Sequence, residues 1–394
     1  MDFDLTEEHR LVEEMVRGFT EKEVKPLAAH LDLGGRYPAD LVKKLGKMGL
    51  MGMFVAQEFG GSGMDLLSYA IAVEEISKAW ASLSVIMSVN NSLVCGPLQH
   101  FGSEAQKSKY LIPLAQGKFL GCYALTEPGA GSDAGGIQTR ARRDGNDYLL
   151  NGAKVLITNG KHADIAIVYA VTDPSQPKKG VSAFIVEKGF SGFAVGKLED
   201  KLGLRSSDTA ELIFQDCRVP KENLLGAENE GLKIALETLD GGRIGIAAQA
   251  VGIAQGCLEE SLAYAKQRRQ FGRPIAGFQA IQWMLADMAT EIDAARLMTY
   301  RASWLRQQGK RVTREAAMAK LFASEAANRA AYKALQVFGG YGYIKDSPVE
   351  RFFRDARVTT LYEGTSEIQR LVIARHLIHG AEGGHESYEC REEN

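Results

Sequence analysis

The stretch Thr359-Thr360-Leu361-Tyr362-Glu363-Gly364-Thr365-Ser366-Glu367-Ile368-Gln369 combines a turn with the start of a helix near the end of the chain. Glu363 is a lone carboxylate beside a tyrosine, and an aromatic, partly apolar wall would raise its pKa towards the range of a general base. Gly364 has no side chain, so a carbonyl group could approach the backbone N–H groups there. Thr365 and Ser366 suit a helix N-terminus, where free N–H groups attract anions. Taken alone, such a stretch is more often an ordinary turn with a solvated glutamate, so the rest of the chain must decide.

The composition is that of a globular protein with more than one domain. A chain of 394 residues is long for a single core, and its 45% hydrophobic and 24% charged residues are typical of globular proteins. The net charge of −2 argues against a nucleic-acid-binding protein. The five cysteines are odd in number and form no CxxC pair, and the seven histidines form no HExxH. We therefore expect a reducing compartment, no disulfide framework and no metal site.

The first eight residues are acidic and amphipathic, which is typical of neither a signal peptide nor an Arg-rich transit peptide. We find no apolar run of membrane-spanning length in the sequence, so we predict no membrane span. These features predict a cytoplasmic protein of bacterial type, or a mitochondrial matrix protein only if a transit peptide has been removed.

Apolar spacing divides the chain into an α+β arrangement of three domains. Residues 1–120 have helical spacing, with helices expected over 40–50, 66–80 and 83–98. Residues 121–228 hold short β-rich runs bounded by turn residues, with strands expected over 121–126, 148–151, 153–158, 165–172, 182–187 and 210–214. No long helices intervene, so the sheet should be mainly antiparallel, a small barrel or sandwich. Residues 229–380 fit a four-helix bundle, with helices over 244–267, 278–307, 313–338 and 366–378, and residues 381–394 a disordered tail.

Several residues are predicted to begin or end these helices. Thr6, Asp40 and Asp240 are candidate N-caps, and Ser103 with Gln106 fits a capping box. Three further features should interrupt or end helices: Pro26, the pair Gly34-Gly35 and the pair Gly339-Gly340.

A glycine-rich stretch, Gly129-Ala130-Gly131-Ser132-Asp133-Ala134, formally matches the GxGxxA pattern of dinucleotide-binding proteins. That pattern needs a long helix after it, whereas Gly135-Gly136 and a charged turn follow here, so we reject a Rossmann fold. The alternatives are a structural turn, or a loop whose small residues let a flat ring or a phosphate reach the backbone.

The longer stretch Tyr123-Ala124-Leu125-Thr126-Glu127-Pro128-Gly129-Ala130-Gly131-Ser132-Asp133 closely resembles the flavin-contacting signature of the acyl-CoA dehydrogenases. The stretch 359–369 resembles the active-site segment of the same family, and further matches extend to about Gly380. The resemblance implies FAD as the cofactor. It also implies that Tyr123, Leu125, Thr126, Gly131 and Ser132 contact the flavin, with Ser132 near the substrate as well.

The segment Lys154-Val155-Leu156-Ile157-Thr158-Asn159-Gly160 is similar to a second flavin-lining part of the family. The resemblance implies that Leu156, Ile157 and Thr158 line the flavin, with Thr158 near its pyrimidine edge. The family usually has Trp where this chain has Leu156. The change from Trp to Leu removes an aromatic wall beside the flavin ring. It would affect how the flavin is shielded from solvent and how electrons leave it.

The segment Leu239-Asp240-Gly241-Gly242-Arg243-Ile244-Gly245 resembles the part of the family that faces the substrate. The resemblance implies that Asp240 and Arg243 lie near the thioester substrate, together with Gly364. Some family members, the isovaleryl and long-chain types, place their base at the position of Gly242. Here that position is glycine, and Glu363 occupies the commoner base position.

Matches later in the chain imply a nucleotide site shared with a neighbouring subunit, as in a tetramer built from dimers. The resembling segments are Arg268-Arg269-Gln270-Phe271-Gly272 with Phe278-Gln279, and Gln336-Val337-Phe338-Gly339-Gly340-Tyr341-Gly342. The resemblance implies that Arg268 pairs with the pyrophosphate, as a guanidinium fork can. The other implied contacts to FAD are Phe271, Gln279, Gln336, Gly339, Gly340, Thr365 and Glu367.

The resemblance implies desaturation of an acyl-CoA thioester, in which Glu363 takes the α-proton and the β-hydrogen leaves as hydride to flavin N5. It also suggests an electron-transferring flavoprotein as the electron acceptor. The segment around Asp240 is most similar to the short-chain, butyryl-type members, which favours a short straight, branched or cyclic acyl group. A dicarboxylyl substrate would need a cation near Ser84, where none is found in the sequence. The alternatives are a dicarboxylyl or medium-chain substrate, a flavin-binding relative that is not a dehydrogenase, or an oxidase.

Overall fold

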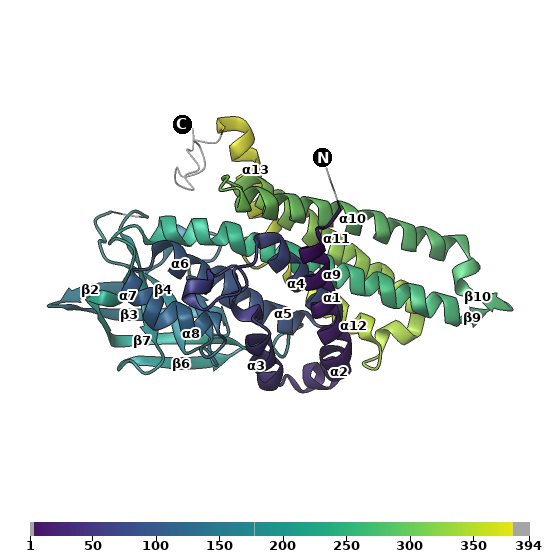
Figure 1. Ribbon diagram of the computed structural model, residues 1–394, viewed down its shortest axis with the longest axis horizontal. Helices are drawn as coiled ribbons and strands as arrows, with labels where there is room; N and C mark the ends of the chain where they lie inside the picture. Colours follow the sequence, from purple (N-terminus) through teal and green to yellow (C-terminus); the bar gives the residue numbers. More distant parts are fainter. Residues whose placement is uncertain (1–3, 177, 381–394) are drawn as a thin grey trace.

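The computed structural model describes residues 4–176 and 178–380, with a sheet at one end and long helices extending away from it (Figure 1). Helical segments precede and follow the sheet in the chain, as the α+β prediction required. The predicted tail over 381–394 lies outside the described residues.

From residue 4 onward, eight α-helices come before the sheet, and two of the predicted caps are confirmed. The Thr6 hydroxyl accepts a hydrogen bond from the backbone N–H of His9, and Ser103 and Gln106 form a full capping box. The helices are α1 (Glu7–Phe19), α2 (Lys25–Gly34), α3 (Ala39–Lys47), α4 (Leu66–Ala79), α5 (Ala81–Ser88), α6 (Gly96–Phe101), α7 (Glu104–Gln106) and α8 (Ile112–Ala115).

Two predictions about this part were wrong. Pro26 does not interrupt the first helical run, because it lies in the first turn of α2, where a missing N–H costs nothing. Asp40 does not cap α3, since the helix begins one residue earlier, at Ala39. The helix end at Gly34-Gly35 is confirmed, with Gly35 in the left-handed conformation at φ 58°.

By length and composition alone, one stretch in this part could cross a membrane, so the sequence reading that no apolar run reaches that length was wrong. It covers Ala81–Phe101, where α5, a π-helical turn and α6 follow one another for 21 residues. Its apolar part is entirely buried inside the protein, as in the core helix of many globular domains.

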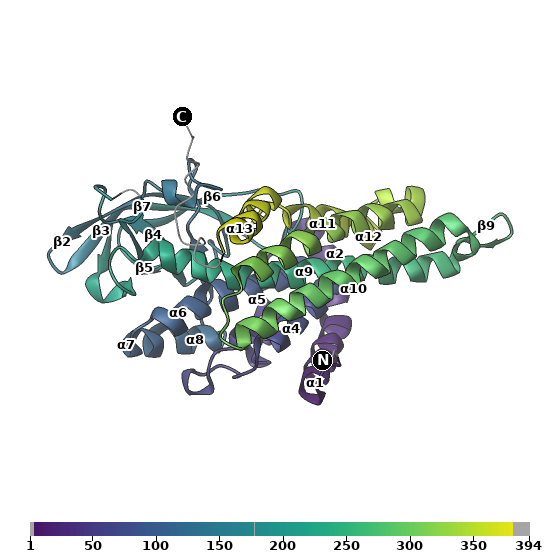
Figure 2. The same cartoon turned by 90° about the horizontal axis from the view of Figure 1, so that it is seen from above.

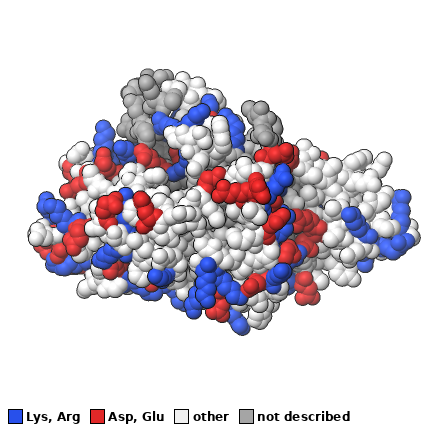
Figure 3. Space-filling model, viewed as in Figure 1, with Lys and Arg blue, Asp and Glu red and all other residues white. Residues whose placement is uncertain are grey.

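On the face of the molecule drawn in Figure 3, positive and negative side chains are interspersed over the surface.

The sheet has eight strands in the order β6-β7-β3-β2-β4-β5-β8, with β1 paired to β4. The strands are β1 (Gly121–Ala124), β2 (Arg140–Asp144), β3 (Asp147–Thr158), β4 (Ile165–Val171), β5 (Val181–Glu187), β6 (Phe193–Leu198), β7 (Thr209–Pro220) and β8 (Leu224–Leu225). The pairings are antiparallel except for β1–β4 and the single bridge β2–β4, which confirms a mainly antiparallel sheet.

The strand predictions missed β2, β6 and the two-residue β8, and cut β3 in two. β2 is rich in arginine and buries only Ala141, so it lacks an apolar pattern. β6 is an edge strand without a fully buried residue. β3 passes through Gly152, which takes φ 148° at a shift of register against β7.

The helices after the sheet form a bundle around α9 (Figure 2). They are α9 (Gly231–Gln267), α10 (Gln279–Gln307), α11 (Thr313–Phe338), α12 (Pro348–Val358) and α13 (Ser366–His379). A short hairpin of β9 (Arg269–Gln270) and β10 (Arg273–Pro274) joins α9 to α10 at the end far from the sheet. The prediction of four long helices omitted the shorter α12, whereas the predicted end of α11 before Gly339 is confirmed.

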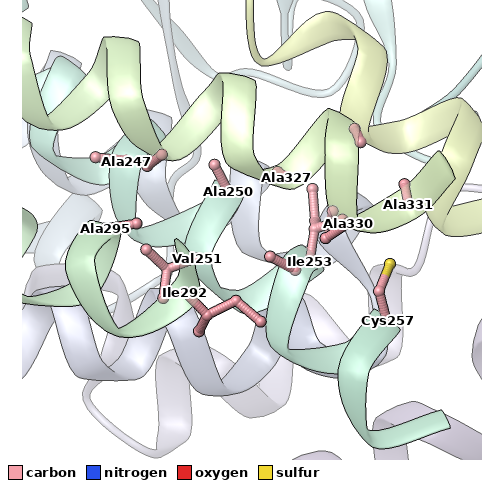
Figure 4. Packing of buried hydrophobic residues seen from close by; sticks show 14 of the residues in the cluster. Ala247, Ala250, Val251, Ile253, Cys257, Ile292, Ala295, Ala327, Ala330 and Ala331 are labelled. Atoms are coloured by element: carbon pink, nitrogen blue, oxygen red, sulfur yellow. The ribbon is translucent and has the colours of Figure 1, made fainter. Parts of the chain in front are cut away.

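Asp240 was wrongly predicted to cap a helix, because α9 is 37 residues long and already begins at Gly231. The pair Gly241-Gly242 reads as a helix break but lies inside α9. Facing α9, α11 presents alanines, and this alanine seam includes Ala247 and Ala250 of α9 and Ala327 and Ala331 of α11 (Figure 4). Small side chains on both helices let their backbones approach closely.

Candidate active site

The turn between α12 and α13 holds Glu363 in an uncommon backbone conformation. Glu363 has φ 52° and Gly364 has φ 90°, so two successive residues lie in the left-handed half of the Ramachandran plot. That conformation is unfavourable for a residue with a side chain. Thr365 then caps α13, because its hydroxyl accepts a hydrogen bond from the N–H of Ile368 at 3.3 Å. The predicted start of a helix at this point is confirmed.

The Glu363 carboxylate is directed into the protein. Its Oε2 atom is buried and has no hydrogen-bond partner within the described residues. Burial raises the pKa of Glu363 to about 8, although the positive charges of Lys320 and Arg243 act to lower it. A carboxyl group in this state exchanges its proton near neutral pH, as a general base must.

Gly242 on α9 leaves the space that this carboxylate occupies. A methyl group built on Gly242 would lie 2.0 Å from Oε2 of Glu363 and 2.8 Å from Cδ2 of Leu93. Residue 242 therefore has to be glycine for Glu363 to keep its present position, and α9 forms the back wall of the site.

Replacing Gly242 with alanine is expected to displace the Glu363 carboxylate while changing stability little, and to slow about tenfold any reaction in which this carboxylate takes a proton. The added methyl group meets the far end of a flexible side chain, so Glu363 can rotate away, but misplacement of a reacting group by about 1 Å is costly. Steady-state kcat and thermal unfolding measure the two effects. Gly18→Ala in α1, where a methyl group meets nothing within 4 Å, is the matched control. An unchanged kcat in Gly242→Ala would show that the carboxylate does not need this position.

Glu363 lies in a cavity of ≈ 170 Å³, here called the Glu363 cleft, between α5, α9, the sheet and the turn. The cleft brings together many residues that the sequence predicted from separate segments. These are Tyr123, Leu125, Thr126, Gly131, Ser132, Leu156, Ile157, Thr158, Arg243, Glu363 and Gly364. The sequence did not predict the apolar residues that complete the lining, which include Val85, Val89, Leu93, Leu236, Leu239 and Ile368.

Leu156 takes its place in the cleft through an irregularity of β3. Its φ is 59°, and the pairing of β3 with β7 shifts register between Lys154 and Ile157. The side chain is 62% exposed, which is unusual for leucine in a sheet. A bulge of this kind redirects a side chain, and here it leaves an aliphatic group open at the cleft.

A buried ion pair connects two segments that line the cleft, the loop after β1 and strand β3. Lys154 of β3 is fully buried, and its Nζ donates to Oε1 of Glu127 at 2.7 Å and to the carbonyl of Leu125 at 3.0 Å. The Glu127 carboxylate also accepts the backbone N–H groups of Gln138 and Thr139. Burial lowers the pKa of Lys154 to about 8, and Glu127 acts against that shift. The pair thus connects the loop after β1 to β3.

Arg243 and Asp240 form a second ion pair at the cleft, within α9. Nη1 of Arg243 donates to Oδ1 of Asp240 at 2.8 Å, and the Thr313 hydroxyl donates to Oδ2 at 2.6 Å. Arg243 is buried, lines the cleft and keeps a buried Nε without a partner among the described residues. Asp240 itself is not among the lining residues, so it acts on the cleft through Arg243.

A second cavity, here called the hairpin cavity, lies at the far end of α9 and has a volume of ≈ 640 Å³. It contains four of the predicted nucleotide residues, Arg268, Phe271, Gly339 and Gly340. The Arg268 guanidinium lies 5.3 Å from the ring centre of Tyr341, and no salt bridge engages it within the described residues. Phe271 is 92% exposed. An unpaired guanidinium beside exposed aromatic rings is suited to a phosphate or a flat heterocycle.

The remaining predicted residues line neither cavity. Gln279 and Gln336 are exposed at the start of α10 and near the end of α11, and Glu367 is exposed in the first turn of α13. Thr365 is the cap of α13 described above. The two cavities are far apart, because the 25 residues from Arg243 to Arg268 along α9 correspond to roughly 37 Å at 1.5 Å per residue.

Sequence reasoning missed two residues that hold the Glu363 turn, Lys320 of α11 and Gln369 of α13. Lys320 Nζ donates to the Gly364 carbonyl at 2.7 Å, and Gln369 Nε2 donates to the same carbonyl at 2.9 Å. The signal for Lys320 was present in the sequence, since a lysine in register with Ala316, Ala323 and Ala327 interrupts an apolar helix face. Gln369 gave no such signal.

Comparison with known proteins identifies the family. Residues 6–118, 122–217 and 229–378 match the acyl-CoA dehydrogenase N-terminal, middle and C-terminal domain families. The chain is 53% identical over 374 residues to the short-chain specific acyl-CoA dehydrogenase of Clostridium acetobutylicum, covering 95% of this chain and 99% of the relative. The butyryl-CoA dehydrogenase of Megasphaera elsdenii has the same fold, with a TM-score of 0.95, 47% identity and coverage of 96% of this chain and 100% of the other.

A chain in a solved structure of the electron transferring flavoprotein of Acidaminococcus fermentans is also similar, with a TM-score of 0.95 and 51% identity over 96% of this chain and 100% of the other. The chain belongs to the acyl-CoA dehydrogenase family. That family consists of FAD-dependent oxidoreductases, so the predicted enzyme class and cofactor are confirmed.

Proposed function

We propose that this protein desaturates a short-chain acyl-CoA thioester to the 2-enoyl-CoA, with Glu363 as the base that removes the α-proton. One observation carries the proposal: the Glu363 carboxylate is buried in the cleft, its Oε2 has no partner among the described residues, and its pKa is raised to about 8. A base that is unpaired and titrates near neutral pH is suited to a weakly acidic C–H bond. The short-chain dehydrogenase and butyryl-CoA dehydrogenase named above support the same substrate class.

The residues of the cleft fit the flavin of FAD. When bound, FAD accepts the β-hydrogen of the substrate as a hydride. A methyl group built on Gly131 would meet nothing within 4 Å, so this loop is open towards the cleft, and Thr126 and Thr158 supply hydroxyl and backbone groups at its edge. We propose that the flavin contacts are Tyr123, Leu125, Thr126, Gly131, Ser132, Leu156, Ile157 and Thr158.

The turn itself supplies the second part of the chemistry, a donor for the thioester oxygen. No hydrogen bond occupies the backbone N–H of Glu363 among the described residues, so it is free to donate to an oxyanion. An oxyanion donor contributes about 3–4 kcal/mol, and a placed base about 10²–10⁴-fold. Gly364, Ser132, Arg243 and Asp240 are the proposed substrate contacts, with Asp240 acting through its ion pair to Arg243.

The lining of the cleft favours an uncharged acyl group. Val85, Val89, Leu93 and Leu239, which line the cleft, are apolar. Ser84 is buried and hydrogen-bonded to Ser77 at 2.7 Å, so it offers no charge to a distal carboxylate. The cation among the lining residues, Arg243, is already paired with Asp240. A dicarboxylyl substrate would therefore be left with an unpaired charge, which is costly to bury.

The hairpin cavity supports a site completed by a second copy of the chain. One cofactor cannot occupy both cavities of a single chain across roughly 37 Å. We propose that Arg268, Phe271, Gln279, Gln336, Gly339 and Gly340, with Thr365 and Glu367 at the start of α13, contact the nucleotide part of FAD between subunits of a homotetramer. We also propose that an electron-transferring flavoprotein accepts the electrons and that the protein is bacterial and cytoplasmic. The proposed domains cover residues 1–120, 121–228 and 229–380.

Mixing the yellow protein with butyryl-CoA without oxygen tests the function. Loss of flavin absorbance within the dead time of manual mixing is expected, because proton and hydride leave the substrate in one site. Absence of bleaching with any short, medium-chain or dicarboxylyl thioester would reject dehydrogenation in favour of a flavin-binding scaffold. Stoichiometric peroxide formation in air would favour an oxidase.

A further inference from the structure

Lys320 lies in the middle of α11, on a face that is otherwise made of alanine. Ala316, Ala323 and Ala327 precede and follow it in helical register, and all four residues are buried. Lys320 is 0% exposed. Burying an ammonium group is unfavourable unless hydrogen bonds or opposite charges compensate, so a lysine at this position needs a reason.

The Lys320 ammonium has one hydrogen-bond acceptor and no close carboxylate within the described residues. Nζ donates to the carbonyl oxygen of Gly364 at 2.7 Å. No carboxylate oxygen among those residues forms a salt bridge with it. Burial lowers the pKa of Lys320, and the charge of Glu363 is the one that most opposes this shift.

Two donors converge on the turn that carries Glu363. Besides Lys320, Gln369 of α13 donates to the carbonyl of Gly364 at 2.9 Å and to that of Glu363 at 3.1 Å. The left-handed conformations of Glu363 and Gly364 persist only where their surroundings impose them. Gln369 supplies hydrogen bonds alone, whereas Lys320 supplies a hydrogen bond and a charge.

The charged groups near Lys320 lie on the Glu363 turn and on the helices around it. Glu363 lies on the turn, Arg243 on α9, Glu325 on α11 and Glu367 on α13. Glu367 is exposed, and Glu325 is paired with Arg370, so both interact less with Lys320 than the buried Glu363 does. The ammonium and the carboxylate are therefore the two buried charges that most affect one another.

We propose that Lys320 is a positioning residue for the reaction: its ammonium holds the Glu363–Gly364 turn through the Gly364 carbonyl, and its charge favours the ionised form of Glu363. This inference rests on the proposed function, since it assigns Lys320 a role through the base. Lys320 is not among the residues that line the Glu363 cleft, so it acts through the backbone of the turn and through its charge.

Lys320→Met tests the proposal, because methionine has a similar length but neither charge nor donor. With butyryl-CoA and an artificial electron acceptor, kcat at the pH optimum should fall at least about tenfold, because the turn loses a donor. The acidic limb of kcat/KM against pH should also move upward by about one unit, because an opposite charge that lowers the pKa of Glu363 is gone. Flavin absorbance per protein should stay within twofold of the parent.

Two matched variants separate charge, hydrogen bond and helix effects. Gln369→Leu removes donors to the same turn without removing a charge, so its kcat should fall while its acidic limb stays in place. Lys333→Met makes the same substitution on α11 at a lysine paired with Asp287, away from the turn, and should change neither quantity. If Lys320→Met does not fold, Lys320→Gln, which is also neutral, must show the same upward shift of the limb.

The outcomes distinguish this inference from the proposed function. If the parent protein bleaches with butyryl-CoA but Lys320→Met keeps kcat within threefold and an unmoved limb, the role of Lys320 is overturned and the function stands. If both neutral variants fail to fold while Lys333→Met folds, Lys320 serves stability alone, and the proposal is likewise overturned. If the parent does not bleach with any thioester, the proposed function has failed first.

Discussion

Glu363→Gln is expected to leave the protein yellow and to abolish measurable dehydrogenation. Glutamine has the shape of glutamate but cannot take the α-proton, and a placed base contributes about 10²–10⁴-fold. The flavin contacts proposed above lie on β1, β3 and the loop after β1 and do not include residue 363, so the cofactor should remain bound. The flavin spectrum and the rate of anaerobic bleaching with butyryl-CoA measure the two quantities. Turnover within tenfold of the parent would reject Glu363 as the base.

The same variant makes a prediction about stability and pH. The folded-state pKa of Glu363 is raised from an ordinary 4.5 to about 8, so folded protein holds a proton that unfolded protein has already lost in this window. Stability from this group is therefore present below about pH 4.5 and is lost as the pH rises through 8. Glu363→Gln has no such group, so its free energy of unfolding should exceed that of the parent by a margin that grows from pH 5 to pH 8. A constant margin in denaturant titrations would contradict the raised pKa.

Lys154→Met is expected to destabilise the protein by about 3–5 kcal/mol and to reduce flavin retention. Removing one partner of a buried ion pair leaves the other charge uncompensated, which is the costly case. Glu127 would keep only its two backbone donors, and the loop after β1 would lose its side-chain hydrogen bonds to β3. Thermal unfolding and flavin absorbance after gel filtration measure both effects.

A double variant and a surface variant control this prediction. Lys154→Met with Glu127→Gln buries no charge, so it should regain part of the lost stability. Lys197→Met removes an exposed lysine from the same sheet, where it pairs with Glu199, and should leave unfolding and flavin content unchanged. Equal stability of the parent and the single variant would show that the pair does not hold the cleft together.

Local signals in the sequence were sufficient wherever a residue acts on its own neighbours. Thr6, Thr365 and the pair Ser103–Gln106 were readable as caps, because a cap bonds to an N–H two or three residues away. The strands β4 and β5 were readable from continuous apolar runs, which mark strands buried on both faces. The members of the Glu363 cleft were predicted through family resemblance, since their segments meet only in the folded chain.

Contacts between residues far apart in the sequence, and residues whose surroundings override their local pattern, could not be predicted in this way. Lys320 and Gly364 are 44 residues apart, and nothing local to either announces the contact. Asp240 was a candidate cap by residue type, whereas it lies inside α9, and Gly242 in the same helix leaves space for the Glu363 carboxylate. β2 buries one residue, so its strand character comes from pairing with β3 and not from its own composition.

The alanine seam between α9 and α11 has a further consequence. Gly242 of α9 lies against the Glu363 carboxylate, and Lys320 of α11 donates to the Gly364 carbonyl, so both helices contact the same turn. The distance between α9 and α11 is set along the seam by the methyl groups of alanine, the smallest side chain after that of glycine. One bulkier side chain anywhere along this contact would push the two helices apart. The position of the Glu363 carboxylate is therefore controlled by residues far from it.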